Sequence, residues 1–149
     1  MRAVVQRVSE ASVSVEGEVI GSVGDGMIVL IGIHREDTEK EMEYIARKIS
    51  GLRIFEDDEG VMNRSVTDTG GSVLLIPQFT LYGDVRKGKR PSYIEAMPPD
   101  RAALFFDDFV ELFRRMYGNV ETGKFGADMR VSLVNRGPVT ILLDSSRNF

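Results

Sequence analysis

The sequence predicts an α+β fold in which a mixed or antiparallel, barrel-like sheet carries two packed helices. Strand-like segments outnumber helical ones, and strand-forming segments separate the two helical patterns, so the regular alternation of a parallel α/β sheet is absent. So many strands would leave exposed edges, which a barrel-like closure removes. No linker, repeat or low-complexity tract interrupts the chain, so we expect one domain spanning residues 1–149.

The first third of the chain has strand patterns. "ASVSVEGEVIGSV" alternates around Glu16-Gly17, which is typical of a hairpin. Gly24-Asp25-Gly26 indicates a second turn before the continuous apolar strand Met27 to Ile33. Further on, "LRIFEDDEGVMN" looks like a strand running into an acidic turn, Glu56 to Glu59. This turn lacks the spacing of an EF-hand loop, so we interpret it as the charged tip of a hairpin.

Two segments show helical spacing. The first begins at Thr38, where "TEKE" fits a capping box, and Gly51 is placed to end it. The second begins near Pro98-Pro99-Asp100 and ends before Gly118, and its aromatic stripe is typical of core packing. "GSVLLIPQFTLYGD", between the two helices, and "MRVSLVNRGPVTILL", at the end of the chain, are strand-like again.

The composition excludes several kinds of site. There is no cysteine, so disulfides, thiolate metal sites and thiol nucleophiles are excluded. The single histidine, His34, cannot form a histidine-rich metal site within one chain and has no obvious serine partner for a triad. Walker, dinucleotide, HExxH and GxSxG motifs are absent. We therefore expect no metal and no cofactor.

We expect neither a membrane span nor an export signal in this sequence. No apolar run approaches the ~18 residues of a membrane span, and "MRAVVQRVSE" has no long apolar region of a signal peptide. We expect a cytoplasmic location and no membrane partner. The net charge of −4 disfavours nonspecific nucleic-acid binding by the whole surface.

One local exception to this charge is "VRKGKRPSY". Four basic residues lie close to an aromatic residue in this segment, namely Arg86, Lys87, Lys89 and Arg90. Such a loop could contact phosphates. A solvated loop explains the same pattern equally well.

Two strand-like segments are interrupted, and these breaks are the most informative part of the sequence. "PQFTL" (Pro77 to Leu81) and "NRGPVT" (Asn135 to Thr140) each combine a proline with a threonine. Central strands avoid proline because it cannot donate a ladder hydrogen bond. A break frees backbone N–H groups that can stabilise an oxyanion and carbonyls that can accept from an ammonium group. Two edge strands or bulges without a function would give the same pattern.

From end to end, the chain resembles the D-aminoacyl-tRNA deacylases, homodimeric enzymes that remove D-amino acids from mischarged tRNA. The resemblance includes "RIFEDDEGVMNRSV", "KGKRPSY" and "TGKFGADMRVSLVNRGPVT", and the two breaks match the family motifs SQFTL and NxGPVT in order. One residue departs from the pattern, because Pro77 stands where the family has serine. The resemblance implies chemistry carried by backbone groups and by the RNA, so we expect activity to survive this change.

The resemblance further implies that the Gly137–Pro138 peptide bond is cis and reaches from one subunit of a homodimer into the pocket of the other. Its carbonyl oxygens would face the bound amino acid and exclude an L side chain. Arg7 would hold this element in orientation, although a salt bridge elsewhere is the alternative.

The resemblance also implies the residues of the pocket. Gln78, Phe79 and Thr80 would line it, and the N–H groups of Phe79 and Thr80 would stabilise the oxyanion. The Thr80 hydroxyl is a candidate nucleophile, but no activating base is evident, so we favour assistance by the 2′-OH of the terminal adenosine. Phe125 and Met129 would receive that adenosine, with core packing as the alternative. The basic loop Arg86 to Arg90 would contact acceptor-stem phosphates.

The expected activity is hydrolysis of D-aminoacyl-tRNA to a free D-amino acid and tRNA, without metal or cofactor. Glycine mischarged on alanine tRNA is an expected second substrate, because a filter against a side chain cannot reject its absence. The alternative is a noncatalytic module that binds the tRNA end or another nucleic acid. A nuclease-like role is disfavoured, because no carboxylate–metal constellation is present.

Overall fold

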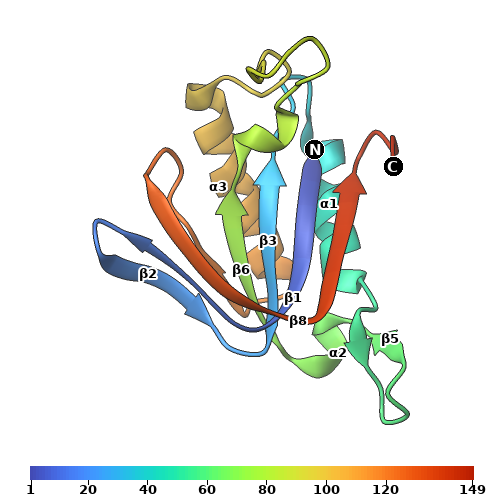
Figure 1. Cartoon of the computed structure of the whole chain (residues 1–149). Coiled ribbons are helices and arrows are strands. Elements are labelled where there is room, and N and C mark those ends of the chain that lie inside the picture. The colour runs from blue at the N-terminus through green and yellow to red at the C-terminus, as the bar shows by residue number, and fades with distance from the viewer.

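The computed structural model describes all 149 residues, which form one mixed sheet, a separate two-stranded hairpin and a layer of helices (Figure 1). The strands are β1 (Arg2–Val15), β2 (Glu18–Val23), β3 (Gly26–Gly32), β4 (Phe55–Glu56), β5 (Met62–Arg64), β6 (Ser72–Pro77), β7 (Val120–Thr122) and β8 (Met129–Asp144). The helices are α1 (Glu39–Gly51), α2 (Val66–Thr69), the 3-10 helix η1 (Phe79–Tyr82) and α3 (Pro99–Met116).

The main sheet is mixed, as predicted. Its strand order is β2-β1-β3-β6-β7, and β8 pairs with β1. β1 is antiparallel to β2, β3 and β8, whereas the β3–β6 and β6–β7 pairs are parallel. The carboxyl ends of β3 and β6 therefore meet at the same edge of the sheet.

The two long strands, β1 and β8, give the sheet its barrel-like curl. The first half of β1 pairs with β3 and the second half pairs with β2, while β8 runs antiparallel to both halves. In Figure 1 the β1–β2 hairpin and the first half of β8 swing away from the plane of β3 and β6. Apolar side chains fill the space inside this curl, among them Val13, Ile28, Leu74 and Ile76. The predicted barrel-like α+β fold is confirmed.

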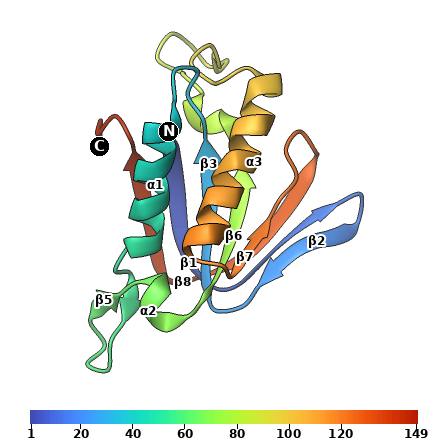
Figure 2. The same cartoon turned by 180° about the vertical axis from the view of Figure 1, so that it is seen from behind.

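The main core lies on the opposite face, under α1 and α3, which cover the sheet in Figure 2. Met27, Val29 and Ile31 of β3 belong to this core, whereas Ile28 belongs to the core inside the curl. Both faces of β3 are thus buried, which explains why its sequence is continuously apolar rather than alternating. No helix in the structure is both long enough and apolar enough to cross a membrane.

The two predicted helices, α1 and α3, are confirmed. The Glu41 carboxylate accepts hydrogen bonds from the Thr38 N–H (2.9 Å) and hydroxyl (2.6 Å), so the capping box forms, and α1 ends at Gly51. The prediction omitted α2 and η1, because one turn is too short to show an apolar period. α2 depends on a local cap instead, since Ser65 and Asp68 bond to each other's backbone N–H groups.

Candidate active site

The first predicted break lies at the carboxyl end of β6, where the strand stops at Pro77 and η1 begins at Phe79. The first hydrogen bond within this turn runs from the Leu81 N–H to the Gln78 carbonyl oxygen at 3.3 Å. The N–H groups of Phe79 and Thr80 precede that bond, so the helix offers them no acceptor. Both residues are exposed, and their donors are available to a ligand.

Two residues, Arg2 and Gly32, fix η1 against the ends of β1 and β3. Arg2 donates from Nη1 to the Leu81 carbonyl oxygen at 2.9 Å, and its guanidinium lies 4.6 Å from the centre of the Tyr82 ring. A Cβ atom at Gly32 would lie 2.9 Å from Leu81 Cβ and 3.2 Å from the Gln78 carbonyl oxygen. Only glycine therefore lets η1 pack this closely across the end of β3.

A cleft of about 550 Å³ opens beside η1, and most of its lining residues are apolar. It holds Gln78 and Phe79 together with Phe125 and Met129, four of the residues predicted to form the pocket, whereas Thr80, predicted with them, is not among its lining residues. The rings of Phe79 and Tyr93 meet edge to face, with centroids 5.0 Å apart. Aromatic rings and a thioether are surfaces on which a nucleobase can stack and pack.

On the other side of the cleft, Gly123 allows Met129 and Ile76 to pack closely against the backbone. A Cβ atom at Gly123 would lie 2.7 Å from the Met129 sulfur and 3.0 Å from Ile76. The Lys124 N–H donates to the same sulfur at 3.4 Å. These contacts fix Met129 against the end of β6. Neither Gly123 nor Lys124 was predicted to contribute to the site.

The Thr80 hydroxyl has no basic partner. It accepts a hydrogen bond from the side-chain amide of Gln78 and bonds to no histidine or carboxylate. His34 lies against Tyr82 and places Nε2 2.9 Å from Glu95 Oε2, a hydrogen bond that lowers the pKa of Glu95. The structure therefore gives His34 a role in holding its loop, and it leaves Thr80 without the base that a hydroxyl nucleophile requires.

The second predicted break is a bulge in β8. β1 pairs with Asn135 on one side of Arg7 and with Thr140 on the other, so residues 136–139 have no ladder partner. The Gly137–Pro138 peptide bond in this bulge is cis, and Gly137 has a φ of 132° that favours glycine. Both residues are exposed, with their backbone groups outside the ladder.

Two side chains hold the bulge in shape. Asn135 closes its base, because its Oδ1 accepts from the Val139 N–H at 2.8 Å and its Nδ2 donates to Gln6 Oε1 at 2.8 Å. Arg7 supports it from β1 by donating from Nε to the Arg136 carbonyl oxygen at 2.9 Å. The residue that precedes Gly137 is thus tied directly to the sheet.

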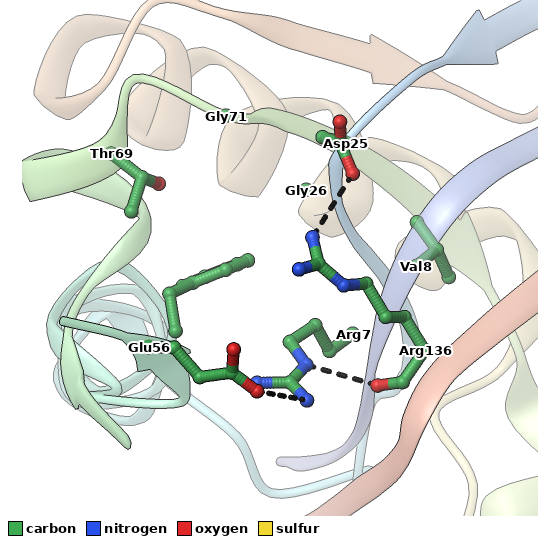
Figure 3. A pocket seen from close by; sticks show the side chains of 9 residues that line it. Arg7, Val8, Asp25, Gly26, Glu56, Thr69, Gly71 and Arg136 are labelled. Atoms are coloured by element: carbon green, nitrogen blue, oxygen red, sulfur yellow. Dashed lines mark hydrogen bonds and ion pairs between the residues drawn. The ribbon is translucent and has the colours of Figure 1, made fainter. Parts of the chain in front are cut away.

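Arg7 lies at the bottom of a polar pocket of about 240 Å³ under the bulge, as Figure 3 shows. Its side chain is buried, and Nη1 donates to the Ile54 carbonyl oxygen at 2.8 Å. Nη2 lies 3.6 Å from Glu56 Oε1. Above it, the exposed side chains of Arg136 and Asp25 form a second pair at 3.5 Å.

The bulge and the cleft lie at opposite ends of the sheet within one chain. Arg7 pairs with Met27 at the start of β3, whereas Pro77 pairs with Ile31 near its end. The four residue steps from Met27 to Ile31 span roughly 13 Å along the strand. Accordingly, Gly137 and Pro138 do not line the cleft beside η1 of their own chain.

The basic loop follows η1 and leads to Tyr93, so it lies at the cleft end of the sheet. Arg86 is already engaged, because it forms hydrogen bonds of 2.9 and 2.8 Å with Asp84 that hold the pKa of this carboxyl below its usual range. Lys87, Lys89 and Arg90 are exposed and form no ion pair. Three of the four predicted cations are therefore open to a ligand.

The acidic segment is the hairpin tip that the sequence predicts. β4 and β5 pair in a two-stranded sheet, and Asp57 caps the turn between them. Its carboxylate accepts from the N–H groups of Val61 and Glu59, both at 3.0 Å, and the bond from Val61 is the main cause of its lowered pKa. No group of three or more acidic, histidine or cysteine side chains is arranged to hold a metal ion.

Sequence reasoning missed several residues that shape these two regions. Asn135 opens the second motif, and its position was the only available signal for its role. Tyr93 was noted only as a neighbour of the basic loop, whereas it lines the cleft. Nothing in the sequence pointed to Gly32, and Glu56 was noted only as part of the acidic turn, since their contacts depend on how distant segments pack.

Comparison with known proteins places this geometry in a family. A family model described as "D-Tyr-tRNA(Tyr) deacylase" matches residues 4–144. Proteins named D-aminoacyl-tRNA deacylase from Thermotoga petrophila and Desulfitobacterium hafniense are 58% and 57% identical over 149 residues, covering 100% of each chain.

Two solved structures are also similar. One is called "c-Myc DNA Unwinding Element Binding Protein"; it has a TM-score of 0.93 and 48% identity, covering 97% of this chain and 98% of its own. Another, described as "Structural Analysis of a probable eukaryotic D-amino acid tRNA deacylase", has a TM-score of 0.82 at 18% identity, covering 95% and 97%, and shows the fold alone. The family model and the full-length relatives show that this chain belongs to the D-Tyr-tRNA(Tyr) deacylase family.

Proposed function

We propose that the chain hydrolyses the ester bond of D-aminoacyl-tRNA and releases the free D-amino acid and tRNA. The observation that carries this proposal is the cleft at the end of β6, which Phe79, at the start of η1, lines together with Phe125 and Met129. Full-length relatives named for this activity support it. Pro77 provides no N–H, but the two donors that matter belong to the residues that follow Gln78.

The chemistry begins at the ester carbonyl. As water attacks, the carbonyl oxygen becomes an oxyanion, and the N–H groups of Phe79 and Thr80 donate to it. Losing one such donor costs about 10²–10³ in rate in other acyl-transfer enzymes. Because the donors belong to the backbone, this step needs no acidic or basic side chain.

The attacking water is activated by the substrate. The 2′-OH of the terminal adenosine lies next to the ester and takes the place of the base that Thr80 lacks. Phe125 stacks on the adenine and Met129 packs against it, which holds the ester near the N–H donors. Lys87, Lys89 and Arg90 contact acceptor-stem phosphates and position the RNA without reading its sequence.

A second copy of the chain selects the stereochemistry of the bound amino acid. The distance between the bulge and the cleft within one chain supports a homodimer, in which Gly137–Pro138 of one protomer faces the cleft of its partner. Its carbonyl oxygens accept from the ammonium group and occupy the space of an L side chain. Exposed apolar residues of β8, Val131, Val134 and Leu142, give the partner a surface to contact. Glycine passes this filter, so glycyl ester on alanine tRNA is a second substrate.

The proposal is tested by single-turnover hydrolysis of D-Tyr-tRNA and L-Tyr-tRNA with EDTA present, using the wild type and Thr80→Ala. Loss of only the D ester with both proteins supports backbone catalysis and substrate assistance. Loss with the wild type alone, when Thr80→Ala is folded, returns the Thr80 hydroxyl to the role of nucleophile or essential orienter. A wild type that leaves the D ester intact rejects the deacylase function.

A noncatalytic nucleic-acid module is the second candidate. It is favoured by one observation, the similarity to a solved structure named as a DNA-element binding protein. This function predicts binding of a tRNA end or a DNA duplex without ester loss. The same single-turnover experiment, combined with a filter-binding measurement on both nucleic acids, separates the two candidates.

A further inference from the structure

Glu56 lies close to Gly137–Pro138 in space although the two are far apart in the sequence. It belongs to the β4–β5 hairpin, which pairs with no strand of the main sheet. The hairpin is therefore free of the ladder that fixes β1 and β8. Arg7 contacts both the hairpin and the bulge (Figure 3).

The Arg7 guanidinium joins the hairpin segment to the bulge. Nε donates to the Arg136 carbonyl oxygen at 2.9 Å on the bulge side, and Nη1 donates to the Ile54 carbonyl oxygen at 2.8 Å on the hairpin side. A Cβ atom at Gly137 would lie only 2.9 Å from Nη2. The guanidinium therefore lies directly against Gly137.

The charge of Arg7 has one counter-ion. The side chain is 6% exposed, and Glu56 is the only carboxylate within 4 Å of it. A buried cation is costly unless a partner compensates it, and an arginine fork is oriented by the anion that it faces. Glu56 therefore faces the third nitrogen of a guanidinium whose other two nitrogens donate to the Arg136 and Ile54 carbonyl oxygens.

Asp25 provides the contrast within the same pocket. It also pairs with an arginine, but the side chains of Asp25 and Arg136 are 78% and 57% exposed, whereas those of Glu56 and Arg7 are 46% and 6% exposed. Exposed pairs of this kind contribute little to orientation or stability. Asp25 contacts the Arg136 side chain, whereas Glu56 contacts Arg7, which donates to the Arg136 carbonyl oxygen.

From this geometry we propose that Glu56 is a positioning residue for stereochemical selection, acting through Arg7 on the carbonyl groups around Gly137–Pro138. The inference rests on the proposed function, because it concerns the element that excludes the L side chain. A displaced bulge leaves the oxyanion donors in place but opens room for the L isomer. The Glu56→Gln variant therefore loses discrimination more than it loses turnover of the D ester.

The test compares the wild type, Glu56→Gln and the matched control Asp25→Asn. We expect the ratio of D-Tyr-tRNA to L-Tyr-tRNA hydrolysis to fall about tenfold or more in Glu56→Gln, since small misplacements in a site have large kinetic effects. Asp25→Asn should keep the wild-type ratio. Equal ratios in Glu56→Gln and the wild type would overturn the inference.

A second readout is independent of activity. NMR measures the chemical shifts of the Arg7 Nε–H and of the Gly137 amide. Both resonances should shift in Glu56→Gln but not in Asp25→Asn. If the wild type hydrolyses no D ester, the proposed function fails, and the NMR comparison still decides whether Glu56 positions the bulge. Unchanged resonances in Glu56→Gln reject the positioning role, whatever the activity.

Discussion

Arg7 Nε donates a hydrogen bond of 2.9 Å to the carbonyl oxygen of Arg136, so a strand of the sheet holds the residue that precedes Gly137. The contact is between a side chain and a backbone group, and it does not depend on which side chain residue 136 carries. The shape of the bulge is thereby uncoupled from the identity of that residue.

Arg7→Ala should destabilise the fold by about 3 kcal/mol, because it leaves two carbonyl oxygens without their charged donor. Arg7→Lys keeps the charge but cannot reach the carbonyl oxygens of both Arg136 and Ile54, so it should recover only part of the loss. Arg136→Ala is the control, since it keeps the carbonyl and removes an exposed side chain; its effect should stay within about 0.5 kcal/mol. Urea unfolding measures all three, and a similar loss in Arg136→Ala would contradict the prediction.

Mixed dimers should restore an active site from two inactive variants. Phe125→Ala damages the cleft, and Gly137→Val damages the bulge, where a Cβ atom would lie 2.9 Å from Arg7. If the bulge serves the partner's cleft, one of the two sites in a mixed dimer combines an intact cleft with an intact bulge. We expect hydrolysis of D-Tyr-tRNA by the mixture after subunit exchange to exceed that of either variant by about tenfold or more.

The same experiment has a clear opposite outcome. If each bulge served its own cleft, every site in the mixture would carry one defect, and activity would not rise. Separately tagged variants, purified as mixed dimers, measure how much exchange took place. Absence of mixed dimers in that purification would itself reject the homodimer.

The sequence marks the two breaks but not their relation in space. Pro77 and Gly137–Pro138 stand out because neither fits a strand ladder, and the structure places a 3-10 helix after one and a bulge at the other. Their separation depends on the parallel register of β3 and β6, which no local pattern encodes. Roles for residues at both breaks followed from the family resemblance, whereas Glu56 and Gly32 act through long-range packing and needed the structure.

Gly32→Ala should reduce catalysis without unfolding the protein. Its new methyl group meets Leu81 and the Gln78 carbonyl, so η1 and its N–H donors must move. We expect the rate of D-ester hydrolysis to fall about 10- to 100-fold, because the donors no longer meet the oxyanion in the right place. Gly51→Ala is the matched control, since nothing lies within 4 Å of its added methyl group. Equal rates in the two variants would show that the position of η1 is unimportant.

Removing the three free cations of the basic loop should weaken tRNA binding and its salt dependence. The variant Lys87→Gln, Lys89→Gln, Arg90→Gln should raise KM, and the slope of log affinity against log salt should fall by about 0.7–0.9 per lost phosphate contact. Arg86→Gln alone should have a smaller effect, because Arg86 is already paired with Asp84.

A control for this variant comes from α1. Replacing Lys40, Arg47 and Lys48 with glutamine removes the same charge from the helix that lies away from the cleft. This control should keep the wild-type slope. If both triple variants changed the slope equally, the effect would be one of net charge, and the loop would not be a contact site.

The stability that the α1 capping box contributes should disappear in acid. The hydrogen bond from the Thr38 side chain is the main cause of the lowered pKa of Glu41, so the folded state favours the ionised carboxylate. A lowered folded-state pKa contributes stability that is complete above the unfolded value of 4.5 and is lost as pH falls through the folded value. Glu41→Gln should therefore destabilise the protein by about 0.5–1 kcal/mol at pH 7 and by almost nothing at low pH. Urea unfolding across this pH range measures the difference in unfolding free energy.

The double variant Thr38→Ala, Glu41→Gln tests the same interaction. Its loss of unfolding free energy should be smaller than the sum of the two single losses, because both changes remove the same interaction. A difference that stays constant down to low pH would show that the Glu41 carboxylate is not the group that stabilises the start of α1.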